Sequence, residues 1–96
     1  MKTIKQTSYF LKWMHKLRDT TAKARLAIRL RRLELGHYGD AKAIDGEVSE
    51  LRFHFGPGYR IYFTERNNEI IILLVGGDKS TQSADIALAK RLASEV

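Results

Sequence analysis

Two segments near the start of the chain carry apolar residues at helical spacing. In residues 8–18, aromatic and aliphatic side chains recur every three or four positions, which predicts a short amphipathic helix. In the next segment leucines recur at the same spacing until Gly36, a usual residue just past a helix end, and Thr20 or Thr21 can cap its start. Because the Asp19-Thr20 link is only long enough for a turn, we expect the two helices to form a hairpin.

From Glu47 onward apolar and polar residues alternate, which is the period of a β-strand. The alternation resumes after the Gly-Pro-Gly sequence at residues 56–58, so the pattern predicts a β-hairpin that turns at these three residues. A turn there pairs Phe53 with Ile61 and places the whole apolar set on one face of the sheet.

The last third of the chain predicts one more strand and a final helix. The uninterrupted apolar run of residues 70–75 is typical of a strand covered on both faces, and we expect it in the middle of the sheet. Gly76-Gly77 should break this strand, and Asp78 or Ser80 can cap the helix that follows. The residues around Ile4 could add a short strand at the sheet edge, and the sequence favours neither this strand nor its absence. The order of elements predicts an α+β fold with an antiparallel core.

The hairpin also has a polar face, opposite the apolar one. The predicted register puts Arg52 across from Tyr62 and His54 across from Arg60. Guanidinium and imidazole groups on neighbouring positions repel one another and add little to folding, so we expect them to bind an anion such as phosphate. The alternative is an ordinary solvated strand surface, partly neutralised by Glu50.

Composition and charge narrow the class of protein. The 96 residues include 17 Lys and Arg against 11 Asp and Glu, a formal charge of +6. This length predicts a single domain over residues 1–96, and the excess of base predicts an anionic partner, either nucleic acid or an acidic protein segment. The absence of cysteine excludes disulfides, thiolate metal sites and a cysteine nucleophile. No apolar run is long enough for a membrane span, and the first residues lack the core of a secretion signal, so we expect no membrane partner and a cytoplasmic location.

Two further basic features are candidates for anion binding. Arg25, Arg29 and Arg32 share one stripe of the second predicted helix and could follow an RNA backbone, or could be a solvated face opposite the leucines. Lys79 lies between the glycine pair and the last helix, where free backbone amides could also bind an anion; a simple turn and cap is an equally good interpretation. The three histidines show no paired spacing, so we expect no metal site.

Three strings relate the chain to a known family: ELRFHFGPGYRIYF at residues 50–63, LLVGGDKS at 73–80 and DIALAK at 85–90. With them the sequence closely resembles HigB-like toxins of the RelE/ParE superfamily, the toxin halves of type II toxin–antitoxin modules. The resemblance extends through the helical hairpin and so covers nearly the whole chain. It implies a RelE/ParE-like fold, in which a helical hairpin packs on a small twisted antiparallel β-sheet with a C-terminal helix.

The resemblance also implies an activity and partners. HigB-like toxins cleave mRNA, commonly on the translating ribosome, and need neither a metal nor another cofactor. A cognate antitoxin, usually with a helix-turn-helix domain, restrains the toxin, and the pair usually binds its own operator DNA. A competing implication is a ParE-like protein that inhibits DNA gyrase without catalysis; a third is an inactive remnant that only binds its partner. The polar hairpin face favours the nuclease.

RNA cleavage by the ribose 2′-OH requires a base for the attacking hydroxyl, an acid for the leaving oxygen and positively charged side chains beside the phosphate. The polar face of the predicted hairpin could supply these groups, with Arg60 and Arg52 as phosphate clamps and His54 or Tyr62 as acid or base. The resemblance itself implies Arg60, at the GYR string, and Lys79, at the GGDKS string, as a second positive charge.

Overall fold

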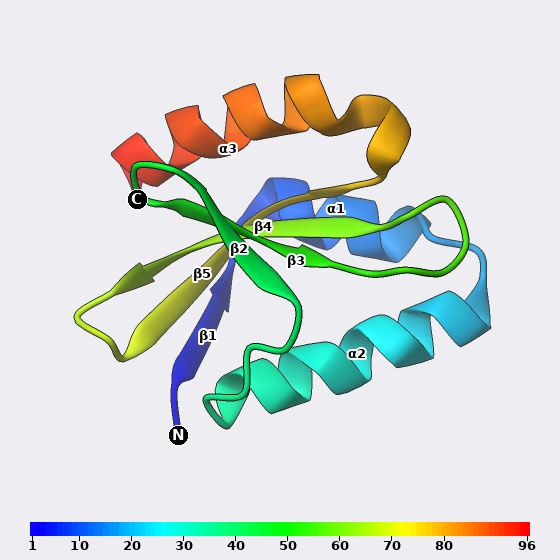
Figure 1. Cartoon of the computed structure of the whole chain (residues 1–96), viewed down its shortest axis with the longest axis horizontal. Helices are drawn as coiled ribbons and strands as arrows, with labels where there is room; N and C mark the ends of the chain where they lie inside the picture. The colour runs from blue at the N-terminus through cyan, green and yellow to red at the C-terminus, as the bar shows by residue number, and fades with distance from the viewer.

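The computed structural model describes residues 1–96, which form five strands, three α-helices and one short 3-10 helix. The strands are β1 (Thr3–Gln6), β2 (Ala41–Asp45), β3 (Val48–Arg52), β4 (Arg60–Arg66) and β5 (Ile70–Gly77). The helices are α1 (Ser8–Lys16), α2 (Thr20–Glu34), η1 (Lys79–Thr81) and α3 (Gln82–Glu95). The strands form one sheet, with α2 along one side of it and α3 along the other (Figure 1). The predicted α+β class is therefore confirmed.

The sheet has the strand order β1-β5-β4-β3-β2, and only the β1–β5 pair is parallel. The predicted edge strand around Ile4 is confirmed as β1. Two predictions about the sheet were wrong: β4, and not the apolar run of β5, is the central strand, and β2 was not expected at all. The β2 sequence, AKAID, has too few large apolar residues to mark a strand, because an edge strand buries little surface.

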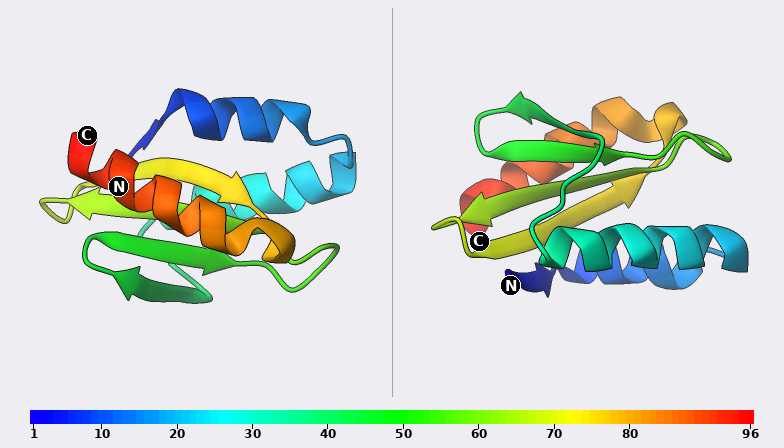
Figure 2. Two further views of the ribbon diagram at one scale, coloured as in Figure 1. Left: turned by 90° about the horizontal axis from the view of Figure 1, so that it is seen from above. Right: turned by 60° about the horizontal axis from the view of Figure 1, so that its bottom comes forward.

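Each face of the sheet has its own hydrophobic core. Phe10 of α1 and Leu26 and Leu33 of α2 pack on one face, and Figure 2 shows both helices away from α3. Ala89 and Leu92 of α3 pack on the opposite face. The first core also holds Leu51, Phe53, Ile61, Phe63, Ile71 and Leu73, and the second holds Val48, Tyr62, Leu74, Val75 and Ala93.

The predicted hairpin register is wrong by two residues. Ile61 pairs with Leu51 instead of Phe53, Arg52 pairs with Arg60, and the connection lengthens to residues 53–59. Because the shift is even, the apolar side chains keep their predicted face. The opposite face is not open as expected, since α3 lies on it.

The caps and glycines explain where the elements begin and end. Asp19, and not Thr20 or Thr21, caps α2 by accepting hydrogen bonds from two backbone amides. Gly36 has a φ of 88°, the left-handed conformation expected just past a helix end. Gly76-Gly77 does not break β5 but lies within it.

The two glycines of β5 provide space for side chains from two helices. A Cβ on Gly76 would collide with the Trp13 ring, and one on Gly77 would collide with the Asp85 carboxylate. Asp78 caps the short η1 with a capping box. The prediction that Asp78 or Ser80 caps the last helix was wrong, because η1 intervenes and Thr81 stands at the N-cap of α3. No helix of the protein is long and apolar enough to cross a membrane.

Candidate functional site

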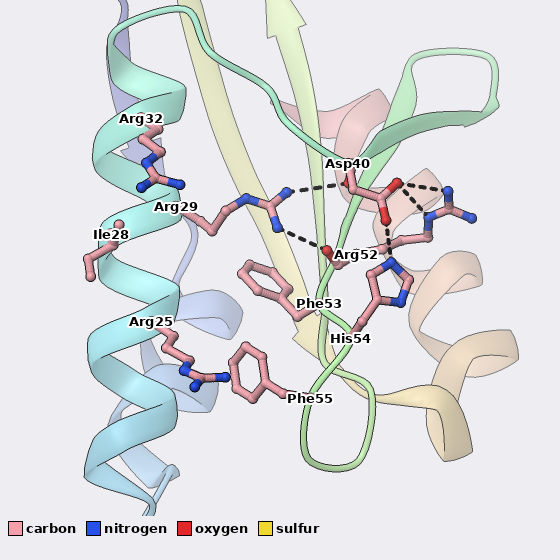
Figure 3. Close-up of a pocket in the computed structure, with 9 residues that line it drawn as sticks. All are labelled: Arg25, Ile28, Arg29, Arg32, Asp40, Arg52, Phe53, His54 and Phe55. Atoms are coloured by element: carbon pink, nitrogen blue, oxygen red, sulfur yellow. Dashed lines mark hydrogen bonds and ion pairs between the residues drawn. The ribbon is translucent and has the colours of Figure 1, made fainter.

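A hollow of about 260 Å³ lies between α2 and the end of β3 (Figure 3). We call it the arginine hollow, because four of the side chains around it are arginines from two parts of the chain. It is lined by Arg25, Ile28, Arg29, Arg32, Asp40, Arg52, Phe53, His54 and Phe55. The predicted RNA-binding stripe and two of the predicted catalytic residues, Arg52 and His54, therefore meet in one place.

The α2 arginines differ in what they contact. The guanidinium of Arg25 lies 4.7 Å from the ring centroid of Phe55, and that of Arg29 lies 4.6 Å from the ring centroid of Phe53. Both are favourable cation–π distances. Neither Arg25 nor Arg32 forms an ion pair with a carboxylate, and both are exposed, so both are open to a phosphate.

Arg29 holds the floor of the hollow together. Its Nη1 donates to the backbone carbonyl of Arg52 at 3.0 Å, and its Nη2 donates to the carbonyls of Tyr38 and Asp40, both at 3.3 Å. Burial lowers the pKa of Arg29 from its usual value, with Asp40 acting in the opposite direction. Arg29 therefore joins α2 to β3 and to the loop before β2, and its charge is less accessible than those of Arg25 and Arg32.

Asp40 is the carboxylate of the arginine hollow, and the sequence analysis missed it. Arg52 donates to its Oδ1 from Nε at 3.1 Å and from Nη2 at 2.8 Å, and the His54 ring hydrogen-bonds to its Oδ2 through Nε2 (Figure 3). The hydrogen bonds from Arg52 and then from His54 lower the pKa of Asp40. Nothing in the local sequence signals this, since an aspartate after Gly39 looks like an ordinary turn residue.

His54 is the exposed titratable group of the hollow, with 69% of its side chain accessible. Because a carboxylate can only accept hydrogen bonds, the Nε2 that meets Asp40 carries the proton. In neutral His54 this leaves Nδ1 as a free acceptor that can remove a proton from a substrate. The prediction that His54 lies across from Arg60 was wrong, because the strand ends at Arg52 and His54 belongs to the connection.

Arg60 and Tyr62 lie on the other side of the sheet, next to α3. The Tyr62 side chain is fully buried, and burial, followed by the charge of Glu50, raises its pKa to about 12. Arg60 is 5% exposed, donates from Nη1 to the carbonyls of Gly58 and Tyr59, and has its Nε 3.9 Å from Glu50. The structure does not bring these two predicted catalytic residues to the arginine hollow, and the predicted pairing of Tyr62 with Arg52 was wrong.

Lys79 lines a second hollow, of about 270 Å³, on the other side of the 53–55 segment. We call it the loop hollow, because all its lining residues except Lys79 belong to the connection between β3 and β4. The Lys79 side chain is exposed and forms no ion pair with a carboxylate.

No group of three or more His, Cys, Asp or Glu side chains could hold a metal ion.

The chemistry available here is that of an anion site with a proton-transfer group. Four arginines surround one carboxylate, so the hollow keeps a net positive charge. Phenylalanine rings and Ile28 supply apolar surface beside these charges. This combination of cations and aromatic rings is suited to single-stranded nucleic acid, whose phosphates and bases need both.

Two comparisons relate the chain to known proteins. Residues 12–94 match the family of phage-derived Gp49-like proteins (DUF891). The chain is also 46% identical over 93 residues to an uncharacterized protein of Haemophilus influenzae, a match that covers 97% of this chain and 94% of the relative. Both matches span the segments that form the arginine hollow.

Proposed function

Because the chain belongs to the family of Gp49-like phage-derived proteins, within the superfamily of RelE- and HigB-like toxins, we propose that it is a toxin that cleaves mRNA. Membership of this family is consistent with the toxin of a toxin–antitoxin pair and implies a cognate antitoxin. The observation that carries the nuclease proposal is the arginine hollow, where the exposed imidazole of His54 lies in the same hollow as Arg25 and Arg32, two exposed cations that pair with no carboxylate.

In the proposed reaction the ribose 2′-oxygen attacks the adjacent phosphorus while the bond from phosphorus to the 5′-oxygen breaks. His54 takes the 2′-OH proton at Nδ1, and the leaving 5′-oxygen takes a proton from water or from a second acid. The products are a 2′,3′-cyclic phosphate and a 5′-hydroxyl. Asp40 acts as a positioning residue, since it holds the ring of His54 by Nε2.

The arginines have two roles in this proposal. Arg25 and Arg32 are free to bind the phosphate and to stabilise the extra negative charge of the transition state. Arg52 uses Nε and Nη2 on Asp40 and keeps Nη1 for the substrate. Arg60 remains a candidate for a role in the reaction, and its burial favours positioning over contact with the substrate. It donates hydrogen bonds to two backbone carbonyls of the connection that carries His54.

The test is cleavage of mRNA by purified protein, with and without ribosomes, read by mapping transcript ends. We expect His54→Ala to slow cutting by about 100-fold or more, the usual contribution of a general base. His15→Ala is the matched control, since His15 is an exposed histidine of α1 outside both hollows, and it should cut normally. Wild-type cutting by His54→Ala would contradict the assignment.

The same experiment separates the nuclease from a gyrase inhibitor. A gyrase inhibitor needs no proton-transfer group beside a phosphate site, so the exposed His54 favours the nuclease. Growth arrest with intact transcripts, together with loss of DNA supercoiling activity, would support the gyrase alternative. We propose further that the antitoxin carries a helix-turn-helix domain and brings the pair to operator DNA, and that cutting takes place on the ribosome.

A further inference from the structure

The arginine hollow and the loop hollow are separated by a single segment of chain. Phe53, His54 and Phe55 line both of them, so these residues form a ridge with one hollow on each side. The hollows are similar in size, about 260 and 270 Å³. Each is slightly smaller than the roughly 300–1,000 Å³ pockets that take a drug-sized ligand, so each suits one nucleotide unit at most.

Each hollow is lined by cations that form no ion pair with a carboxylate. These are Arg25 and Arg32 in the arginine hollow and Lys79 in the loop hollow. The Lys79 side chain is held at the loop, because its aliphatic carbons lie beside Gly58, where a Cβ would come within 3.0 Å of the Lys79 Cγ. Its backbone amide also donates to the carbonyl of Pro57 at 3.5 Å. The cation of the second hollow is therefore fixed to the same connection that carries His54.

The ridge itself offers a base-stacking surface. Phe55 is only partly buried, and it makes edge-on contacts with Phe53 and Tyr59 at centroid distances of 6.1 and 5.7 Å. Arg25 covers it from the side of the arginine hollow. Unpaired bases usually bind by stacking on aromatic rings with cations nearby. Bases in a duplex are already stacked on one another and are not available for this contact.

We infer that the ridge separates two nucleotide subsites, and that a single RNA strand crosses it with one phosphate in each hollow and the cleaved bond next to His54. This inference rests on the proposed function. Lys79 is then a phosphate-binding residue of the neighbouring nucleotide and does not touch the reacting atoms. The substrate unit is two consecutive unpaired nucleotides, because one nucleotide can occupy only one hollow.

The experiment measures binding of 5′-phosphorylated 2′-O-methyl uridine oligonucleotides of one, two and three nucleotides, which cannot be cut because the attacking hydroxyl is methylated. For the wild-type protein we expect the dinucleotide to bind at least tenfold more tightly than the mononucleotide. Lys79→Ala should remove about tenfold of the dinucleotide affinity, as expected for a lost charged hydrogen bond, and leave mononucleotide binding unchanged. Arg25→Ala should weaken the binding of both.

Lys5→Ala is the matched control, because it removes the same charge from β1, an edge strand that β5 separates from the hairpin that bears the ridge. In a plot of the logarithm of the trinucleotide association constant against the logarithm of the salt concentration, the slope for Lys79→Ala should be shallower than the wild-type slope by about 0.7. This is the change expected for one lost phosphate contact on a single strand. A twelve-nucleotide 2′-O-methyl strand should bind more tightly than its duplex. Equal affinities of mono- and dinucleotide, equal effects of Lys79→Ala and Lys5→Ala, or tighter duplex binding would each overturn the inference.

Failure of the inference can be told apart from failure of the proposed function. If the protein cuts RNA in a His54-dependent way but binds the dinucleotide no more tightly than the mononucleotide, the nuclease proposal stands and the two subsites are refuted. If the dinucleotide binds more tightly and Lys79→Ala abolishes that difference, but the protein cuts no RNA, the two subsites are supported and the nuclease is refuted.

Discussion

Asp40 determines which charges of the arginine hollow are available to a ligand. Without this carboxylate, Arg52 and His54 would both be free, as the sequence pattern predicted. With it, Arg52 is held by two hydrogen bonds and His54 by one, while Arg25 and Arg32 remain open. The free cations and the proton-transfer group are therefore different residues, each with one role in the proposed reaction.

Arg60 and Glu50 form a second polar pair, inside the molecule. Their side chains are 7% and 6% exposed, and Glu50 Oε2 and Arg60 Nε have no hydrogen-bond partner. Removing one member of a buried ion pair leaves the other charge uncompensated. We expect Arg60→Met to lower the free energy of unfolding by about 3 kcal/mol.

The control for this prediction is the double variant Glu50→Gln/Arg60→Met, measured by urea unfolding beside the two single variants. It should regain much of the loss, since no isolated charge is left, but not the hydrogen bonds to Gly58 and Tyr59. A stable Arg60→Met protein would mean that Arg60 does not hold the connection from inside.

At the scale of the element, α2 joins the core to the candidate site. The helix buries its own Leu26 and Leu33 completely against the sheet. The residue before each leucine, Arg25 or Arg32, lies on the exposed surface of the helix. The placement of the arginines therefore depends on the helix being formed along its length. Its first turn depends on Asp19, which accepts hydrogen bonds from the amides of Thr21 at 3.0 Å and Ala22 at 3.1 Å.

We expect Asp19→Ala to destabilise the protein by about 1 kcal/mol, because two amides at the start of α2 lose their acceptor. Asp19→Asn should be close to wild type, since the amide oxygen of asparagine caps equally well. Urea unfolding of the three proteins measures both effects. Equal losses in the two variants would assign the effect to the charge of Asp19 and not to the cap.

At the scale of the whole molecule, ion pairs connect segments that are distant in sequence. Lys2 meets Glu65 at 2.6 Å and so fastens the chain start to β4, and Lys90 meets Asp45 at 2.7 Å and fastens α3 to β2. Hydrogen bonding to Lys90 lowers the pKa of Asp45. Burial acts to raise the pKa of Glu65, but hydrogen bonds from Lys2 and Tyr38 outweigh it and lower the pKa.

These shifts predict a loss of stability in acid. A carboxylate whose pKa is lower in the folded state stabilises the protein above its unfolded pKa, and the contribution disappears as the pH falls through the folded value. The ordinary pKa values are 3.8 for an aspartate such as Asp45 and 4.5 for a glutamate such as Glu65, and both are lowered here, so the loss should occur below about pH 4.

The measurement is the urea midpoint between pH 7 and pH 3. The midpoint should fall less in Asp45→Asn/Glu65→Gln than in the wild type, because the double variant has already lost these two contributions. The matched double variant Glu69→Gln/Glu95→Gln, at exposed carboxylates without ion pairs, should follow the wild type. Parallel behaviour of all three proteins would contradict the linkage.

Local patterns predicted much of the fold, because helices and strands bring neighbours in sequence together at fixed spacing. The periodicity of α1, α2 and β5 predicted their presence, and Gly36 predicted the end of α2. The arginine stripe on α2 followed from the same spacing. The family resemblance came from strings that cover the β3–β4 hairpin with its connection, the end of β5 with the start of η1, and part of α3.

What the sequence by itself determined is which side chains share a face of an element, since that depends only on the helical or strand period. Only the tertiary structure decided what lies against each face. The alternation in β4 looked like an open polar face, yet α3 buries Tyr62 and Arg60 there. Asp40 meets Arg52 and His54 because the β2–β3 pairing brings it beside the end of β3, where the Arg52 amide donates to its carbonyl and Arg29 also binds both segments. Such contacts join residues more than ten positions apart, and no local period encodes them.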